Sequence, residues 1–198
     1  MNTTNAFRVP TVEDLDQFFV RHRLDRTQGV VIAFSGGSDS LSLAILLSQY
    51  VQKEKLIAVY VDHGLRPSEE LQQEIKLNRT NCAAVGIDLE VVELGRYAVS
   101  ETARLRNGGI EDAARYLRRN ALQQVAKAKQ FAYIATGHTS DDQVETVLMS
   151  MLQGGFLSGP KGILAVSLPY IRPLLEYSKE AIRSVVRQRG LSWSEDST

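Results

Sequence analysis

The sequence contains a single cysteine, Cys82, among its 198 residues. One thiol cannot form an internal disulfide framework, and its isolation excludes every C-x-x-C metal or redox motif. No window reaches the roughly 18 apolar residues that a membrane-spanning helix needs. The N-terminus, which reads MNTTNAFRVP, is too polar for the apolar core of a secretory signal. These absences predict a soluble, cytoplasmic protein that does not enter a membrane.

The chain also lacks an excess of charge, because 23 Lys and Arg residues balance 23 Asp and Glu residues. A neutral balance excludes a surface that is basic throughout. Any contact with nucleic-acid phosphates must therefore come from a local cluster of cations or from a segment outside this chain. Hydrophobic residues make up 43% of the chain, which is normal for a globular protein. We expect residues 1–198 to form a single domain, with residues 1–28 as a helical lead-in.

Short apolar runs alternate with helical patterns along the chain. Strands are expected at residues 29–34, 56–61, 89–94 and 131–136. Helices are expected at residues 12–24, 41–51, 68–85, 110–129 and 140–153, and residues 95–109 are expected to be irregular. We also expect Ser68 to cap its helix and Ser140 and Gln143 to form a capping box. This alternation predicts an α/β fold with a doubly wound, mostly parallel sheet and helices on both faces, which binds ligands at the carboxyl ends of its strands.

The most informative stretch is the glycine turn, which comprises residues 35–40 (SGGSDS) between the first strand and the next helix. Two adjacent glycines allow a positive φ and a close approach of the backbone. The amides of the turn and of the helix start then form a concave site for an anion, to which the serine hydroxyls add donors. Asp39 would repel a phosphate, and a Mg²⁺ ion between the two would resolve that conflict.

Other phosphate or catalytic loops do not fit the glycine turn. A Walker A loop needs a lysine after its last glycine, and a dinucleotide fingerprint needs G-x-G-x-x-G; neither pattern is present. A nucleophile elbow, G-x-S-x-G, matches Gly36 and Ser38 but meets Ser40 in place of its last glycine. The alternative is that residues 35–40 form an ordinary strand-to-helix turn with polar capping residues and no ligand. A hydrolase that uses Ser38 as its nucleophile is disfavoured.

The glycine turn resembles the PP-loop of the ATP pyrophosphatase superfamily, which includes GMP synthetases, NAD synthetases, tRNA thiolation enzymes and tRNA(Ile)-lysidine synthases. Further stretches resemble the lysidine synthases in particular and occur in the same order. They are D-H-G-L-R-P at 62–67, I-E-D-A-A-R-Y-L-R at 110–118, T-G-H-T-S-D-D-Q-V-E-T at 136–146, I-R-P-L-L at 171–175 and G-L-S-W at 190–193 with D-S at 196–197. The resemblance runs from about Val30 to the last residue.

This resemblance implies a PP-loop ATPase fold of the adenine nucleotide α-hydrolase type and an ATP-dependent ligase that acts on tRNA. The C2 oxygen of the wobble cytidine in a CAU-anticodon tRNA(Ile) would attack the α-phosphate of ATP, releasing pyrophosphate. The ε-amine of free L-lysine would then displace AMP to form lysidine. The implied ATP-binding residues are Ser35, Gly36, Gly37, Ser38, Asp39, Ser40, Asp62 and His63.

Carboxylates at the start of the 140–153 segment are the second group of candidates. Asp142 and Glu145 are three residues apart and share one face of a helix. Clustered carboxylates there suit either a Mg²⁺ ion or an ammonium group, and the alternative is a solvated acidic helix start favoured by the helix dipole. The resemblance implies that Asp142 and Glu145 bind lysine, that Asp39 and Asp142 hold Mg²⁺, and that Asp39, Asp142 and Arg115 are catalytic.

Basic side chains form the third group. Arg115 and Arg118 are three residues apart on the 110–129 helix and are candidates for contacts to phosphate, as are Arg104 and Arg106 before it. The alternative is a solvated basic face. His138 and Asp141 lack the further ligands of a zinc site, and Cys82 lies among apolar neighbours and is expected in the core.

Three departures from the lysidine synthase pattern concern substrate contacts. The second histidine of the family's H-H pair is Thr139, a common aromatic residue is Arg119, and the glycine segment at residues 154–159 is rewritten. The chain stops at Thr198, where the family continues into tRNA-binding domains. The competing interpretations are another PP-loop enzyme of the thiolation, GMP or NAD synthetase type, or a non-catalytic module that binds ATP or tRNA. A homodimer is compatible with the sequence, in which no feature fixes the oligomeric state.

Overall fold

A computed structural model describes residues 8–64, 68–152 and 162–194. Its centre is a single six-stranded sheet with the strand order β3-β2-β1-β4-β6-β5. All neighbouring strands pair in parallel except β5 and β6, which form an antiparallel edge. The strands are β1 (Val30–Ala33), β2 (Leu56–Asp62), β3 (Asp88–Glu93), β4 (Tyr133–Ala135), β5 (Val166–Ser167) and β6 (Tyr170–Ile171).

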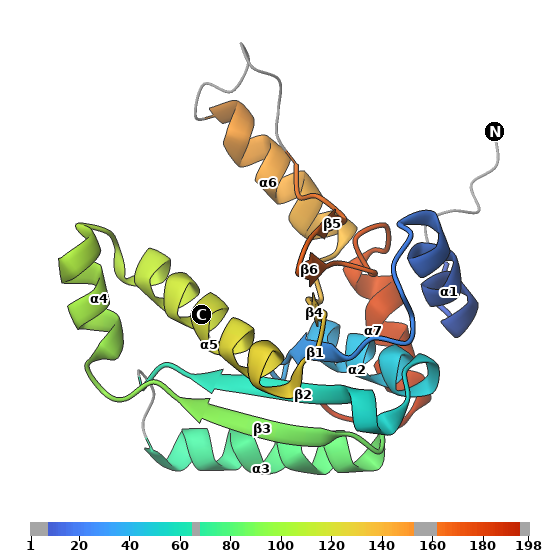
Figure 1. Ribbon diagram of the computed structural model, residues 1–198, viewed down its shortest axis with the longest axis horizontal. Helices are drawn as coiled ribbons and strands as arrows, with labels where there is room; N and C mark the ends of the chain where they lie inside the picture. The colour runs from blue at the N-terminus through green and yellow to red at the C-terminus, as the bar shows by residue number, and fades with distance from the viewer. Residues whose placement is uncertain (1–7, 65–67, 153–161, 195–198) are drawn as a thin grey trace.

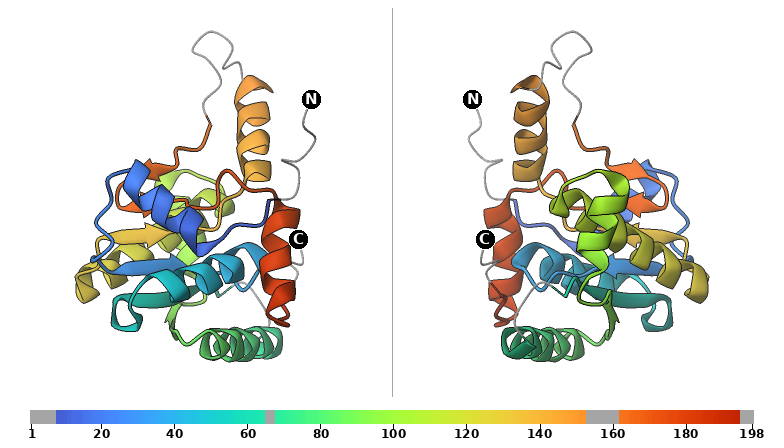
Figure 2. Two further views of the ribbon diagram at one scale, coloured as in Figure 1. Left: turned by 90° about the vertical axis from the view of Figure 1, so that its right-hand side faces the viewer. Right: turned by 90° about the vertical axis from the view of Figure 1, so that its left-hand side faces the viewer.

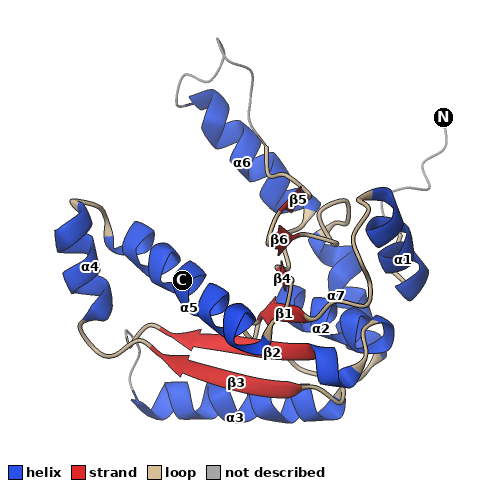
Figure 3. Cartoon of the chain, in the orientation of Figure 1, coloured by secondary structure: helices blue, strands red, loops and turns tan. Residues whose placement is uncertain are grey.

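Helices cover both faces of the sheet, as the secondary-structure colouring of Figure 3 makes clear. They are α1 (Val12–Arg21), α2 (Ser38–Tyr50), α3 (Ser68–Ala84), α4 (Ala98–Arg106), α5 (Ile110–Lys129), α6 (Ser140–Leu152) and α7 (Lys179–Gln188), with a short 3-10 turn, η1 (Lys53–Lys55), before β2. In Figure 1, α3 and α5 lie on opposite sides of β2 and β3. Helix α6 projects away from the body in all three views of Figures 1 and 2.

The alternation of side chains along β1 separates two hydrophobic cores. Val30 and Ile32 face the larger core, which α1, α2, α3 and α7 complete. Val31 faces the smaller core and packs against α5 through Leu122 and Val125. A strand buried on both faces is what a parallel sheet between two helical layers requires. The predicted α/β architecture is therefore confirmed, and no helix of the described residues is long and apolar enough to cross a lipid bilayer.

The expectation that residues 95–109 are irregular is wrong, because α4 occupies Ala98–Arg106. Val99 and Ala103 lie one helical turn apart on α4 and are buried against Ala113 of α5. This stripe of small apolar residues is too short to indicate a helix by its spacing alone, and packing on α5 stabilises it. Asn107 then ends α4 in a left-handed conformation with a φ of 49°.

Strands β5 and β6 and helix α7 were also absent from the sequence-based assignment. Strand β6 pairs with β4 through Ile134–Tyr170 and Ala135–Ile171. Helix α7 then buries Ile182 and Val186 in the larger core. The I-R-P-L-L stretch thus links a sheet strand to a core helix, and it places Arg172 at the carboxyl end of β6. The expected Ser68 cap, Leu65, Arg66, Pro67, the 154–159 segment, Asp196 and Ser197 lie outside what the structure describes.

Candidate functional site

The glycine turn connects β1 to α2. Gly36 has a φ of 86°, a conformation that favours glycine. The Ser40 hydroxyl accepts a hydrogen bond from the Ser35 amide at 3.2 Å and donates to the Gly37 carbonyl at 3.1 Å. These internal bonds fix the curvature of the turn. Because the first amides of α2 have no acceptor within the helix, they are free to bind an anion.

Gly137 is a part of the site that the sequence analysis did not single out. It follows β4 and lies directly against the turn between Asp39 and Ser40. A Cβ atom at Gly137 would stand 2.9 Å from the carbonyl carbon and oxygen of Asp39 and 3.0 Å from the Ser40 nitrogen. Only glycine allows the end of β4 to approach the glycine turn this closely. The only sequence signal was the position of Gly137 directly after the fourth strand.

Two adjoining cavities at the carboxyl ends of the strands form one cleft. Each has a volume of about 390 Å³. Ala33, Ser35, Arg118 and Leu122 line both of them. The first extends over the end of β2 and the second extends between α5 and the start of α6. Ser35 of the glycine turn lies where the two cavities join, Asp39 and Ser40 line the second, and Gly36, Gly37 and Ser38 line neither.

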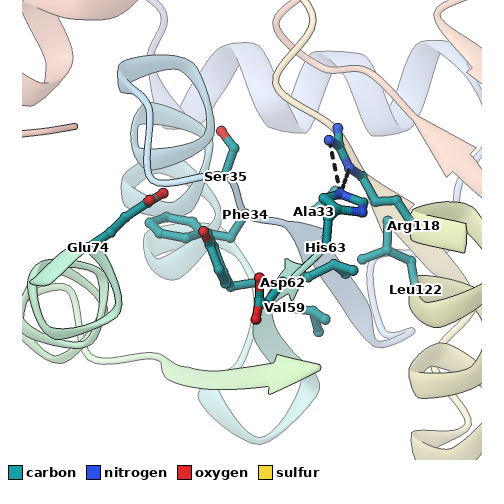
Figure 4. A pocket seen from close by; sticks show the side chains of 11 residues that line it. Ala33, Phe34, Ser35, Val59, Asp62, His63, Glu74, Arg118 and Leu122 are labelled. Carbon is teal, nitrogen blue, oxygen red and sulfur yellow. Dashed lines mark hydrogen bonds between the residues drawn. The ribbon is translucent and has the colours of Figure 1, made fainter. Parts of the chain in front are cut away.

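The first cavity places Asp62 and His63 at the end of β2, as the sequence predicts. Asp62 supports the following turn, because its Oδ1 accepts the Gly64 amide at 2.8 Å. Arg118 of α5 donates to Nε2 of His63 from Nε at 3.4 Å and approaches the same atom with Nη2 at 3.3 Å. Figure 4 shows this pair on one side of the cavity, with Glu74 on the opposite side. The arginine thus belongs to the wall of the cleft rather than to a solvated stripe.

The start of α6 is built differently from the expected Ser140/Gln143 capping box. The N-cap is Thr139, whose amide and hydroxyl both donate to Oδ2 of Asp142, at 2.7 and 2.8 Å. The Asp142 amide in turn reaches the Thr139 hydroxyl at 3.3 Å. The box lies one residue earlier because Ser140 is already the first helical residue. Gln143 instead holds the backbone of Ile163, accepting its amide at 2.6 Å and donating to its carbonyl at 3.2 Å.

This capping box predicts the effect of changing Thr139 to valine. The substitution removes the hydroxyl while retaining the shape of the side chain, and Thr139 is fully buried. We expect the free energy of unfolding, measured by urea denaturation, to fall by about 0.5–2 kcal/mol, the usual worth of an N-cap. Thr80→Val, on the exposed face of α3, is the matched control and should change it by less than about 0.5 kcal/mol. Equal stability of the two variants would contradict the assignment of the cap.

Three charged groups surround the space between the glycine turn and α6. Burial raises the pKa of Asp39, and the negative charge of Asp142 adds to this effect. For Asp142, burial also acts to raise the pKa, but the hydrogen bonds from Thr139 and the charge of Lys179 outweigh it, so that the pKa lies below its ordinary value. Nζ of Lys179 stands 3.5 Å from Oδ1 of Asp142. Asp142 is therefore an oriented carboxylate that already accommodates an ammonium group.

The two acidic neighbours, Asp141 and Asp142, have separate tasks. Oδ2 of Asp141 accepts the Lys179 amide at 2.9 Å. It therefore satisfies one of the free amides at the start of α7 and joins that helix to α6. Asp141 does not line the cleft, whereas Asp142 does. The structure thus separates a helix-joining carboxylate from a carboxylate that faces the cleft.

The second cavity is strongly basic on its α5 side, where Arg115, Arg118 and Arg119 meet Arg172 from the end of β6. Burial and the charges of Arg115 and Arg119 lower the pKa of Arg172. Like charges held together in this way favour an anionic ligand. Sequence reasoning did not single out Arg172, because β6 was absent from the expected sheet. Its Nη1 donates to the Leu164 carbonyl at 2.7 Å, which anchors the guanidinium.

His138 lies in the second cavity, where burial and then the charge of Arg172 lower its pKa. The ring is therefore neutral at physiological pH, and its Nδ1 lies 2.8 Å from the Thr136 hydroxyl. A neutral imidazole ring avoids charge repulsion with the arginines that line the same cavity. Cys82 is buried in the larger core, and burial raises the pKa of its thiol to about 12. The thiol therefore packs in the core, as the sequence predicts.

Not every candidate residue lines the cleft. Glu145 lies on α6 one turn beyond Asp142, is exposed and has no ion-pair partner among the described residues. Arg104 and Arg106 lie in the last turn of α4. Arg106 stacks on the ring of Tyr116, 4.1 Å from its centroid, and lies 3.5 Å from the carboxylate of Asp112. Arg106 thus belongs to the outer face of α4 and α5.

The carboxylates of Asp39 and Asp142 fit a Mg²⁺ ion that is also coordinated by a phosphate. Burial raises the pKa of Asp39, the negative charge of Asp142 adds a smaller effect, and a divalent cation would offset both. Among the described residues, no group of three or more His, Cys, Asp or Glu side chains could hold a metal ion. Mg²⁺ commonly uses one or two carboxylates together with substrate phosphates. Asp39 and Asp142 meet that requirement only in the presence of a phosphate ligand.

Curated proteins resemble this chain in sequence. The chain is 36% identical over 184 residues to the tRNA(Ile)-lysidine synthase of Borreliella afzelii, covering 93% of this chain and 41% of that protein. It is 36% identical to the tRNA(Ile)-lysidine synthase of Mesorhizobium japonicum, covering 95% and 42%. The chain therefore spans about two fifths of the length of these curated relatives.

Solved structures give the same fold at lower identity. The U34-tRNA thiolase NcsA of Methanococcus maripaludis, described with its 4Fe-4S cluster, has a TM-score of 0.73 and 22% identity, covering 94% of this chain and 65% of that one. The NH3-dependent NAD synthetase of Campylobacter jejuni has a TM-score of 0.60 and 17% identity, covering 90% and 71%. The PP-loop domain family itself matches residues 9–198. With its glycine turn at the end of β1 and an oriented carboxylate opposite, this chain is a member of the PP-loop domain family.

Proposed function

We propose that the chain catalyses ATP-dependent modification of tRNA, as the catalytic part of a tRNA(Ile)-lysidine synthetase. One observation carries this proposal. Ser35, Asp39 and Ser40 of the glycine turn, the α5 arginines and the Asp142 carboxylate come from segments far apart in the sequence and meet in one cleft. An anion site, a cationic wall and an oriented carboxylate are the groups that adenylation followed by attack of an amine requires.

The first step would adenylate the wobble cytidine of a CAU-anticodon tRNA(Ile). Its C2 oxygen forms a bond to the α-phosphorus of ATP, the bond to the β-phosphate bridging oxygen breaks, and pyrophosphate leaves. The amides of the glycine turn would bind the departing diphosphate, and Arg115, which lines the second cavity, would contact the transferred phosphate. Asp62 and His63 border the nucleotide side of the cleft. Asp39 and Asp142 would hold Mg²⁺, which neutralises phosphate charge when bound.

The second step would join free L-lysine to the activated base. The ε-amine attacks C2, AMP leaves with the former C2 oxygen, and the amine loses a proton. Asp142 and Glu145 would orient the lysine through its ammonium group. The ammonium group of Lys179 already lies 3.5 Å from Oδ1 of Asp142. The exposed carboxylate of Glu145 offers the second contact, one turn further along α6.

The tRNA would approach over α4 and α5. Arg104, Arg106 and Arg118 present cations on these helices, and Tyr116 adds an aromatic ring at the surface. Arginines bind the phosphates of RNA, and aromatic rings stack on unpaired bases. The anticodon base must leave its stack to enter the cleft. The curated relatives are more than twice as long as the region matched, so contacts beyond this chain belong to the same proposal.

The experiment that tests the function is pyrophosphate release from ATP and Mg²⁺ with different acceptors. We expect release when a tRNA(Ile) transcript with a CAU anticodon is added, and labelled lysine should then become attached to that tRNA. A transcript with GAU in place of CAU is the matched control and should give neither product. The reason is that the attacking C2 oxygen belongs to the wobble cytidine.

Other acceptors separate this function from its competitors. Release driven by xanthylate or by an NAD precursor would reject the proposal in favour of a GMP or NAD synthetase. Thiolation that relies on a cysteine pair or on a cysteine-bound iron–sulfur cluster is disfavoured by the single buried Cys82. ATP binding without turnover of any acceptor by the full-length protein would indicate a binding module.

A further inference from the structure

Asn78 of α3 is a buried polar side chain that lies directly behind the glycine turn. It is 0% exposed. A Cβ atom on Gly36 would stand 2.6 Å from its Oδ1 and 2.9 Å from its Nδ2, so the carboxamide packs against the backbone of Gly36. Neither its oxygen nor its nitrogen has a hydrogen-bond partner in the described part of the chain. A buried amide without partners costs about 1–3 kcal/mol for each unpaired group.

A second asparagine on the same helix makes the contrast clear. Asn81 is 2% exposed, and its Nδ2 donates to the Ser192 carbonyl at 2.8 Å. Ser194, two residues further on, donates its amide to the Gly36 carbonyl at 3.2 Å. The segment 191–194 therefore connects α3 to the glycine turn from behind. One of two neighbouring buried asparagines is paired, and the one that touches the turn is not.

The geometry of an anion-binding turn suggests what Asn78 pairs with. When successive amides of a turn point towards an anion, the carbonyl groups of the same peptides point to the opposite side. In this chain the Gly36 carbonyl accepts the Ser194 amide from the 191–194 segment, which Asn81 of α3 holds through the Ser192 carbonyl. A carbonyl oxygen has two lone pairs and can accept a second donor. Nδ2 of Asn78 is a donor without a partner among the described residues, and its carboxamide lies against Gly36.

We propose that Asn78 is a positioning residue for the glycine turn, whose carboxamide hydrogen-bonds the outward-facing turn backbone when a diphosphate occupies the inner side. This proposal rests on the proposed use of ATP. In the empty turn the buried amide of Asn78 has no hydrogen-bond partner among the described residues, which destabilises that state. When the anion is bound the amide gains a hydrogen bond, and this gain strengthens phosphate binding. It acts through the backbone and touches no substrate.

The experiment measures binding of inorganic pyrophosphate, and of ATP with Mg²⁺, by calorimetry, together with the melting temperature. Asn78→Leu replaces the amide with an apolar group of similar size. We expect its melting temperature without ligand to rise by roughly 2–4 °C, because an unpaired buried amide is removed. We expect the Kd for pyrophosphate to rise about five- to tenfold, the worth of one hydrogen bond. Asn78→Asp, which loses the donor and adds a negative charge, should weaken binding further.

Asn81→Leu is the matched control, because it removes a paired amide from the same helix. Its melting temperature should fall by roughly 2–4 °C. If Asn78→Leu lowers the melting temperature as Asn81→Leu does, or binds pyrophosphate as tightly as the wild type, the positioning role is overturned. If Asn78→Leu does not fold, Asn78→Asp is used instead, and a Kd for pyrophosphate equal to that of the wild type would overturn the positioning role. A wild-type chain that binds neither probe would instead refute the proposed use of ATP.

Discussion

Asp39→Asn is expected to abolish pyrophosphate release while leaving the protein folded. The change retains the size of the side chain and removes the negative charge that would hold Mg²⁺ beside the phosphates. Loss of one such electrostatic group in an active site commonly costs about 10²–10³-fold in rate. We expect at least this loss in the tRNA-dependent assay. ATP binding through the amides of the glycine turn should be retained, because a neutral side chain at this position does not repel the phosphates.

Although Asp39→Asn lowers the activity, we expect it to raise the stability of the fold at pH 7, because of the pKa of Asp39. Burial raises this pKa above its ordinary value of 3.8. The protonated form is therefore favoured by folding, and its contribution to stability is lost as the pH rises from 3.8 through the pKa of the folded state. Asparagine remains neutral throughout. We expect Asp39→Asn to melt at a higher temperature than the wild type at pH 7, and the difference to shrink towards pH 3.8.

The control for this variant is Asp88→Asn. Asp88 is exposed at the start of β3, at the end of the parallel strands opposite to the cleft. Its replacement should change neither the rate nor the melting temperature. Full activity of Asp39→Asn would remove the proposed metal role. A lower melting temperature of that variant at pH 7 would show that Lys179 and Arg183, which attract Asp39, outweigh its burial.

Gly137→Ala is expected to disrupt the glycine turn. The new methyl group would lie 2.9 Å from the carbonyl carbon and oxygen of Asp39, and backbone atoms at the start of α2 cannot move aside as a flexible side chain can. Overpacking of this kind commonly costs about 1–3 kcal/mol. The displaced turn should also lose its anion-binding shape, so we expect the Kd for ATP to rise at least tenfold. Urea denaturation and calorimetry measure the two effects.

Gly109→Ala is the matched control for this prediction. Gly109 has a φ of −74°, and a Cβ atom there meets no atom within 4 Å. The same chemical change at Gly109 should therefore leave ATP binding unaltered. Unchanged ATP affinity in Gly137→Ala would mean that the approach of β4 to the glycine turn plays no part in forming the anion site.

Local sequence was sufficient for those parts of the site that depend on neighbouring residues. The glycine turn follows from two glycines between an apolar strand and a helix, because a positive φ at Gly36 is a local property. The positions of Asp62 and His63 follow from the same logic, since the carboxyl ends of parallel strands meet at one edge of the sheet. Cys82 is buried, as its apolar neighbours indicate.

The sequence failed where short elements depend on distant partners. Helix α4 and strand β6 are too short to have a reliable pattern, and both exist because they pack on α5 and pair with β4. Arg172 was overlooked for this reason, since it reaches the cleft only through β6. The capping box at α6 was placed one residue late because Ser140 and Thr139 are both good caps and local spacing does not choose between them.

By itself the sequence determined the alternation of strands and helices, the glycine turn and the order of the charged segments, because these depend on residues adjacent in the chain. Only the tertiary structure decided which of them meet. It brought Gly137 against Asp39, separated Asp141 from Asp142, and left Asn78 unpaired behind Gly36. The physical reason is that close packing and buried hydrogen bonds join atoms far apart in sequence, and spacing along the chain carries no record of those distances.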